Sequence, residues 1–282
     1  MGQTLGRLAR EAGYEIGDVV CRSARSARSA VKFIGAGHPH ASETARLSQS
    51  DFVLISTPDD KIPDVVKIIE RDIAGEGHAA VLHTSGALSS AVLGPLSRLG
   101  LSAGSCHPLQ TFASPIRSLT LARGCYFCIE GEQKAVKVAR RFVRKIGARY
   151  FEVSTDMKGL YHAAAVLASG GVVALLATSF DMLSLCGLSE AEAIKILIPL
   201  VEGTISNLRA VGPARALTGP VRRGDVGTVE KNIRSIASAN DDWLSVYRLM
   251  SERSLPIAQR AGADESSLAE LRRVLSGIRN NS

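Results

Sequence analysis

Three side chains able to do chemistry interrupt an otherwise apolar stretch within residues 154–181. Lys158, His162 and Ser169 supply an ammonium, an imidazole and a hydroxyl, and no charged residue occurs in 163–180. In a helix, four residues span just over one turn and eleven span about three turns. The spacing therefore predicts one buried helix that carries all three groups on the same face.

A lysine and a histidine one turn apart can serve a reduction. Hydride addition to a carbonyl leaves an alkoxide, which needs a proton or a positive neighbour. Burial lowers the pKa of a lysine, so that it can supply either. We expect Lys158 to be the general acid and His162 its partner. The structural alternatives are a first-turn lysine that reaches solvent and a hydrogen-bonded core histidine.

The first half of the chain alternates strand-like and helix-like segments, and the second half is helical throughout. Alternation with short connections predicts a parallel sheet with helices on both faces. After residue 153 the pattern predicts helices only, at 155–186, 189–211, 225–239, 240–261 and 264–279. We therefore expect an α/β domain at 1–153 and an all-helical domain at 154–282. The strand-like segments are 16–23, 51–60, 79–86, 101–112, 125–131 and 148–153.

The opening of the chain departs from a dinucleotide-binding fold, which normally begins with a strand and a GxGxxG loop. Here Gly2 already lies in a helix-like segment. If Gly2 is the last glycine of that loop, the first strand and two glycines either lie upstream or are absent. Arg22 and Ser23 then fall roughly twenty residues on, where an acidic residue would bind the ribose of NAD. An arginine and a serine suit the extra phosphate of NADP instead; the alternative is that they are solvated helix residues.

Polar residues follow four of the predicted strands, and parallel sheets bind ligands at those strand ends. A Gly-x-Gly sequence also occurs at Gly35 and Gly37. It follows a helix-like segment and is interpreted as the turn that ends this helix, not as a nucleotide-binding loop. We expect His107 to be catalytic, and His83 and His107 to line the substrate side of the nicotinamide. The expected cofactor-binding residues are Gly2, Arg22, Ser23, Thr57, Pro58, Asp59, His83, Thr84 and Ser85.

Several blocks of the sequence resemble a known family. They are VLHTSGALSS, GSCHPLQTF, YFCIEG, KGLYHAAAVLAS and LTGPVRRGD, and the resemblance extends from Gly2 to about residue 260. The chain resembles bacterial Rossmann-like proteins with a helical C-terminal domain of unknown function. These are relatives of pyrroline-5-carboxylate reductase, deazaflavin-dependent NADP oxidoreductases and ketopantoate reductase. The resemblance implies NADP as cofactor and a lysine early in the first helix of the second domain, which Lys158 matches. Gly170 departs from it, because the family usually has asparagine there.

The helical half also offers residues that could contact a substrate. The turn-rich segment 217–225 contains Thr218 and Arg223, and arginine binds carboxylates with two hydrogen bonds. Asp225 in the same segment is expected to cap the next helix. The expected substrate contacts are Gln110, Ser169, Asn207, Thr218 and Arg223.

Composition and charge indicate a globular protein and exclude several other classes. A hydrophobic content of 45% is typical of a globular protein, and the net charge of +7 comes without a basic motif for nucleic acids. The N-terminus has no apolar stretch, the five cysteines lack metal spacing, and Cys125 and Cys128 point to opposite faces of a strand. We expect a reduced cytoplasmic protein that binds no metal, nucleic acid or membrane. The apolar run 163–180 predicts a homodimer through the helical domain.

These observations predict an NADP-dependent oxidoreductase that reduces a small carbonyl or imine acid. The resemblance to ketopantoate reductase implies ketopantoate as the most concrete substrate. The alternative is a non-catalytic nucleotide-binding sensor or scaffold that lost an intact glycine loop.

Overall fold

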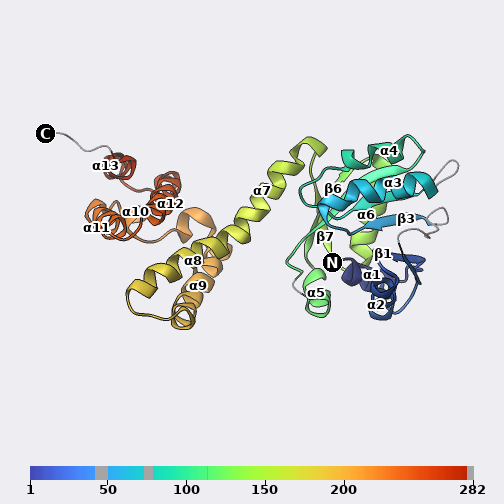
Figure 1. Ribbon diagram of the computed structural model, residues 1–282. Helices are drawn as coiled ribbons and strands as arrows, with labels where there is room; N and C mark the ends of the chain where they lie inside the picture. Colours follow the sequence, from blue (N-terminus) through green and yellow to red (C-terminus); the bar gives the residue numbers. More distant parts are fainter. Residues whose placement is uncertain (42–49, 73–78, 113, 278–282) are drawn as a thin grey trace. The chain divides into compact units, whose positions relative to one another are not determined.

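The computed structural model describes residues 1–41, 50–72, 79–112 and 114–277. The chain divides into two compact units, Met1–Gly171 and Val172–Ser282 (Figure 1). The change from alternating elements to helices comes at residue 153, as expected, but the first compact unit extends to Gly171. The difference arises because the helix that follows the last strand carries side chains that pack at the edge of the sheet.

The described strands of the first unit form two sheets. Strands β1 and β2 pair in parallel, and β3 to β7 form a five-stranded sheet in sequence order. All pairs in the larger sheet are parallel except β5 with β6. The antiparallel pair and strand β2, whose sequence HPHA is not apolar, were not expected from the sequence. The strands are β1 Asp18–Cys21, β2 His38–Ala41, β3 Phe52–Ile55, β4 Ala80–His83, β5 Ser102–Leu109, β6 Tyr126–Gly131 and β7 Arg149–Glu152.

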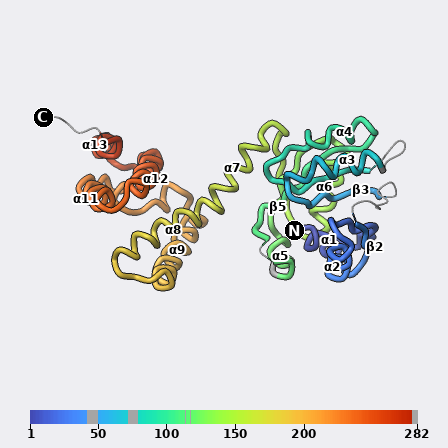
Figure 2. The backbone as a smooth tube through the Cα atoms, in the orientation of Figure 1, coloured from blue at the N-terminus to red at the C-terminus, as the bar shows by residue number. Residues whose placement is uncertain are grey.

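Helices cover both faces of the larger sheet, because alternate strand residues point to opposite sides. Leu82 of β4 packs in a core with Phe142, whereas Val81 packs in another with Ile62 and Leu93. The path of the chain through these layers is clear in Figure 2. The helices are α1 Gly2–Glu11, α2 Ala24–Ile34, α3 Ile62–Asp72, α4 Gly94–Ser97, α5 Pro115–Ala122, α6 Gln133–Lys145 and α7 Lys158–Ala168.

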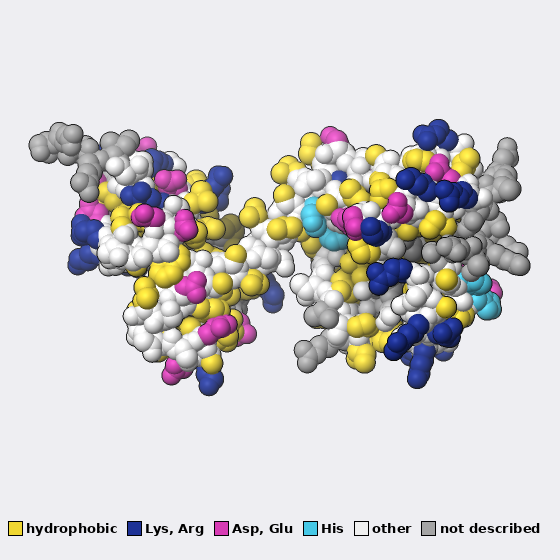
Figure 3. Space-filling model, viewed as in Figure 1, with side chains coloured by type: hydrophobic (Ala, Val, Ile, Leu, Met, Phe, Trp, Pro, Cys, Tyr) yellow, Lys and Arg dark blue, Asp and Glu magenta, His cyan; other side chains and the backbone are white. Residues whose placement is uncertain are grey.

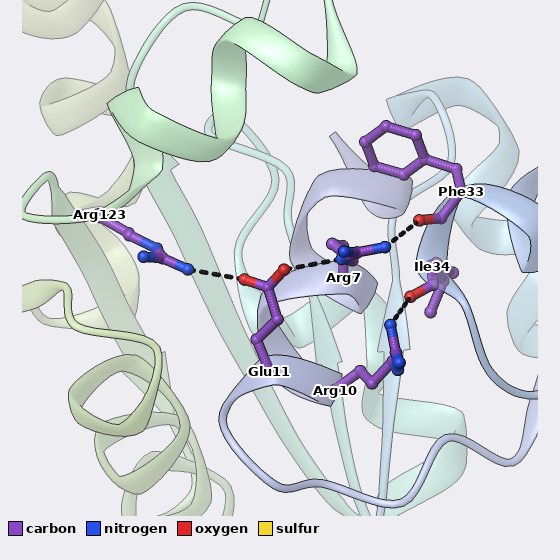
Figure 4. A network of polar contacts seen from close by, with 6 residues as sticks. All are labelled: Arg7, Arg10, Glu11, Phe33, Ile34 and Arg123. Atoms are coloured by element: carbon purple, nitrogen blue, oxygen red, sulfur yellow. Dashed lines mark hydrogen bonds and ion pairs between the residues drawn. The ribbon is translucent and has the colours of Figure 1, made fainter.

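Arginines of α1 hold this helix against its neighbours (Figure 4). Arg7 and Arg10 donate to the backbone carbonyls of Phe33 and Ile34, at 3.2 and 3.4 Å, at the end of α2. These are the carbonyls that a helix leaves without partners of its own. Gly35 ends α2 in the left-handed conformation with φ 82°, which confirms the predicted turn. The positive φ favours glycine there, and a Cβ atom would also lie 2.5 Å from the Arg10 guanidinium, which would have to move aside.

A buried carboxylate, Glu130 of β6, connects three parts of the first unit. It is 2% exposed and accepts hydrogen bonds from the Ser90 amide, the Ser90 hydroxyl and the Thr155 hydroxyl, at 2.8, 2.7 and 2.9 Å. Ser90 begins the 3-10 helix Ser90–Leu93, and Thr155 begins the 3-10 helix Thr155–Met157, directly before α7. Glu130 therefore fixes where α7 starts.

The second unit is a helical domain built around its own core. Buried Val229, Leu255, Leu268 and Leu271 bring its last helices together. Gly212, with φ 74°, puts a kink into α9. The helices are α8 Gly170–Leu185, which begins at the boundary of the units, α9 Glu190–Ala216, α10 Pro220–Arg223, α11 Val226–Ala237, α12 Asp241–Arg260 and α13 Glu265–Ser276.

The single buried helix predicted for 155–186 is instead two helices that expose much of their surface. Ser169, with φ −118° and ψ −81°, separates α7 from α8. Leu160 and Leu167 are 71% and 72% exposed, because nothing in the described ranges covers these apolar side chains. An 18-residue window within Thr155–Leu185 has a mean hydropathy of 1.9, so by length and composition alone this segment could cross a membrane.

We expect Glu130→Ala to lower the free energy of unfolding by about 3 kcal/mol. The substitution leaves the two buried donors of Ser90 without an acceptor and removes the bond from the exposed Thr155 hydroxyl, and each lost bond to the charged carboxylate is worth roughly 1 kcal/mol or more. Urea denaturation of the full chain measures the change. Glu132→Ala is the matched control, because Glu132 accepts one hydrogen bond from Ser97 at an exposed position. Equal stability losses in the two variants would contradict the role given to Glu130.

Candidate functional site

The ends of strands β3, β4 and β5 surround a cavity of about 340 Å³ in the first unit. The N-terminus of α1 and the second turn of α7 complete its wall. Parallel sheets place their ligand sites at this edge, so three of the four predicted polar strand ends come together as expected. The lining residues are Met1, Ser56, Thr57, Pro58, Asp59, Thr84, Ser85, Gly86, His107 and His162.

Hydrogen bonds between neighbouring loops fix the wall of this cavity. The Ser85 hydroxyl donates to Asp59 Oδ2 at 2.8 Å and accepts from the Leu88 amide at 2.9 Å. The Thr84 hydroxyl donates to the Ile55 carbonyl at 3.3 Å. Because these bonds join the end of β3 to the end of β4, the two loops form one preorganised surface.

The N-terminus of α1 approaches the end of β3 very closely. A Cβ atom on Gly2 would lie 3.0 Å from the Cβ of Ser56, so a side chain there would have to displace its neighbour. The Ser56 hydroxyl is buried and has no hydrogen-bond partner among the described residues. A helix N-terminus next to such a hydroxyl suits a phosphate group, and the role of Gly2 as the third glycine of a dinucleotide loop stays a prediction.

Two histidines at the strand ends are held neutral. Burial, followed by the nearby Lys158 charge, lowers the pKa of His83 to about 4. The same two causes, with His162 and His83 adding to them, lower the pKa of His107 to about 4. His83 is fully buried, and its Nδ1 accepts from the Ser85 amide at 3.2 Å. The His83 side chain therefore supports the loop that follows β4 from inside the protein, whereas His107 lines the cavity.

Gly86 is the point at which two imidazoles meet the backbone. A Cβ atom on Gly86 would come within 2.8 Å of His107 Nε2 and closer still to His162 Nδ1. The two imidazole rings lie 5.7 Å apart, nearly perpendicular to each other. His162 Nδ1 is buried without a hydrogen-bond partner. Only a residue without a side chain therefore allows both rings to reach this wall of the cavity.

Lys158 lies beneath the cavity and does not line it. The side chain is 1% exposed, and Nζ donates to the Ser105 hydroxyl at 2.8 Å. The Ser105 hydroxyl in turn donates to the Ser85 carbonyl at 3.4 Å. Burial lowers the pKa of Lys158, while nearby acidic groups that include Glu130 and Asp59 act in the opposite direction. The lysine thus places a positive charge directly behind the strand ends.

The remaining predicted residues lie apart from this cavity or in the second unit. Arg22 is exposed, and the Ser23 hydroxyl caps α2 by accepting from the Ser26 amide. Gln110 is turned toward its own loop, where Oε1 accepts from the Thr111 amide at 2.8 Å. Asp225 caps α11, as predicted. Ser169, Asn207, Thr218 and Arg223 are exposed.

Ser105, Glu130 and Tyr161, which adjoin the site, were not predicted. Ser105 and Glu130 gave no signal of their own, because single small or acidic residues in strands are common. Tyr161 had one, since it lies three residues after Lys158 and therefore on a neighbouring part of the same helical turn. In the described ranges, no group of three His, Cys, Asp or Glu side chains is arranged to hold a metal ion.

Comparison with known families identifies both parts of the chain. Residues 1–108 match a Rossmann-like domain, and residues 125–254 match DUF2520, a domain of unknown function. These matches confirm the predicted combination of a Rossmann-like domain with a helical domain of unknown function. A comparison with curated proteins gave no match.

Solved structures share this fold. A protein from Thermotoga maritima is 28% identical with a TM-score of 0.75, over 91% of this chain and 96% of that chain. A Bacteroides fragilis protein, provisionally assigned as an NADP oxidoreductase, is 18% identical with a TM-score of 0.67, over 90% and 93%. A reductive aminase from Aspergillus terreus, in complex with NADPH and ethyl levulinate, is 14% identical with a TM-score of 0.64, over 99% and 96%. The chain therefore has an oxidoreductase-like fold.

We expect the stability of the protein to fall as the pH drops from about 6.5 to 4, partly through His83. In this interval the unfolded histidine binds a proton that the folded one, with a pKa of about 4, does not bind. Each such histidine can account for roughly 3 kcal/mol at most. His83→Asn, whose amide oxygen can still accept from Ser85, should flatten the dependence of the unfolding free energy on pH. His38→Asn, at a side chain 79% exposed, is the control that should not.

Proposed function

We propose that this protein is a nicotinamide-dependent reductase of a small carbonyl or imine compound. One observation carries the proposal: three strand ends, the N-terminus of α1 and two histidines surround a single cavity. The unpartnered Ser56 hydroxyl and the close approach of Gly2 to Ser56 fit a dinucleotide phosphate at the helix N-terminus. The neighbours provisionally assigned or solved as NADP(H)-dependent enzymes support the same cofactor class.

A bound nicotinamide would supply the hydride, and the residues of this chain would bind, orient and protonate the substrate. His107 and His162 face the cavity from one side, and Asp59 with Ser85 fixes the other. Lys158 remains the proposed source of the proton. Because its Nζ contacts Ser105 below the cavity, the proton must pass through another group, and His162, one turn further along α7, is the candidate.

The proposed cofactor is NADP. Arg22 and Ser23 follow β1, and Arg25 and Arg28 lie exposed on the helix that begins there. Figure 3 shows Lys and Arg side chains gathered over the part of the first unit where α1 and α2 lie. A 2′-phosphate would find charge-assisted hydrogen bonds on such a surface, whereas the ribose hydroxyls of NAD would not need them.

The proposed substrate is a small carbonyl or imine acid, for which Gln110 and Ser169 in the first unit are candidate contacts. Thr218, Arg223 and Asn207, the further contacts expected from the sequence, are exposed residues of the helical unit and stay a prediction. Ketopantoate and cyclic imine acids are the compounds to test first. The alternative function is a nucleotide-binding sensor or scaffold without turnover.

Titration calorimetry of the full chain tests the cofactor. We expect NADPH to bind at micromolar concentration and NADH more weakly. Arg22→Ala should weaken NADPH binding about tenfold, because one charge-assisted hydrogen bond is worth roughly 1.5 kcal/mol or more, and should leave NADH binding nearly unchanged. Lys67→Ala, which removes an exposed charge from α3, is the control. Binding without oxidation of NADPH by any carbonyl or imine acid would favour the sensor, and no binding would contradict both functions.

The protein is further proposed to be a cytoplasmic homodimer that associates through α8 and α9. These helices expose apolar side chains, among them Val173 at 67% and Leu200 at 66%. A continuous apolar surface of this kind usually marks an interface. A second copy is the simplest partner, because it would bring an equally apolar surface.

Light scattering tests the dimer. The chain has a mass of 29.9 kDa, and we expect twice this value in solution. The double variant Val173→Glu and Leu200→Glu should shift the mass toward that of one chain, since it would bury charges in the interface. Ile116→Glu, at an apolar side chain of α5 that is 73% exposed, is the control and should remain dimeric. A wild-type mass of one chain would rule out the proposed dimer.

A further inference from the structure

A tyrosine that sequence reasoning did not select makes the shortest contact to a histidine of the cavity. Tyr161 of α7 places its hydroxyl 2.7 Å from Nδ1 of His107 on β5. The two rings lie 5.8 Å apart at an angle of 71°, so the contact joins them edge to face. His107 Nδ1 therefore points to the tyrosine, and Nε2 is the nitrogen near Gly86 at the wall of the cavity.

The proton in this contact belongs to one of two groups, and the surroundings decide between them. The Cys128 thiol of β6 is a second neighbour of Tyr161. Burial raises the pKa of both the phenol and the thiol, so each keeps its proton. An imidazole nitrogen is a much better acceptor than a neutral sulfur. The tyrosine hydroxyl thus donates to His107 Nδ1.

We propose that Tyr161 is a positioning residue that holds His107 in the tautomer with its proton on Nε2. In this form His107 offers the cavity a neutral hydrogen-bond donor instead of a base. The inference deepens the proposed function and rests on it for its meaning in catalysis: the donor would polarise the carbonyl oxygen or imine nitrogen of the substrate. The proton itself would come by another route, through His162.

The groups around His107 keep it neutral. Lys158 and His162 on α7 and His83 on β4 all act against a second positive charge, in addition to the effect of burial. Cys128, opposite His107 in the pairing of β5 with β6, stays protonated and adds no negative charge. A neutral imidazole with a fixed N–H is a known way to polarise a carbonyl without being consumed as an acid.

The surroundings of Tyr161 allow its hydroxyl to be removed alone. Its ring packs edge to face against Phe151, with centroids 5.5 Å apart, and Lys158 Nζ lies 5.4 Å from the ring centroid. Tyr161→Phe keeps the ring and these contacts. Tyr150→Phe is the matched control, because the Tyr150 hydroxyl accepts a hydrogen bond from Arg144 at the surface. Thermal unfolding should be nearly the same in both variants.

Long-range ¹⁵N–¹H correlation spectra of histidine-labelled full-length protein at pH 7 test the tautomer. A His107→Gln spectrum assigns the signals. We expect wild-type protein and Tyr150→Phe to show His107 almost entirely protonated on Nε2, and Tyr161→Phe to show a mixture of both tautomers. Protonation on Nδ1 in the wild type, or an unchanged tautomer in Tyr161→Phe, would overturn the proposal.

Turnover gives the second readout. With a substrate that the wild type reduces, Tyr161→Phe should lower kcat about tenfold to a hundredfold and leave the Kd of NADPH unchanged, because the cofactor phosphates bind elsewhere. An unchanged kcat would overturn the role in catalysis. If no nicotinamide reaction is found but the tautomer shifts as expected, the proposed function fails and the positioning by Tyr161 stands, so the two failures are distinguishable.

Discussion

A buried ammonium governs the architecture of this site. Lys158 is almost completely enclosed, and one hydroxyl, that of Ser105, is its direct hydrogen-bond partner. A charge in such a place is costly unless nearby groups compensate it. Glu130 does so electrostatically, and the same carboxylate fixes Ser90 and Thr155, hence the start of α7. Glu130 therefore both compensates the charge of Lys158 and fixes the position of α7.

The same charge determines the protonation of the strand ends. His83 and His107 are buried beside Lys158, so both remain neutral well below neutral pH. Neutral imidazoles can act as fixed donors or acceptors, and the hydrogen bonds at Nδ1 decide which. At His83 the Ser85 amide occupies Nδ1, and at His107 the Tyr161 hydroxyl does. His107 thus presents an oriented dipole to the cavity, His83 supports the loop next to it, and the positive charge of Lys158 lies behind both.

Helix α7 contributes residues both to the packing of the first unit and to the candidate site. Its first residue is buried under the sheet, Tyr161 and His162 reach the strand ends, and Leu160 and Leu167 remain exposed. In the part of the chain that the structure describes, many of the apolar residues that suggested a buried helix therefore stay exposed. Their exposure, continued by α8 and α9, is what makes an association between copies physically reasonable.

Alternating patterns in the sequence determined the order of strands and helices, and the strand ends at residues 56–60, 83–86 and 107–111, because periodicity and turn residues are local signals. The family resemblance added the domain combination. Sequence could not place Lys158 below the cavity instead of in it, nor pair Tyr161 with His107 across 54 positions. It also missed the break at Ser169 and the antiparallel β6. These features depend on burial and on contacts between distant segments, which only the folded chain brings together.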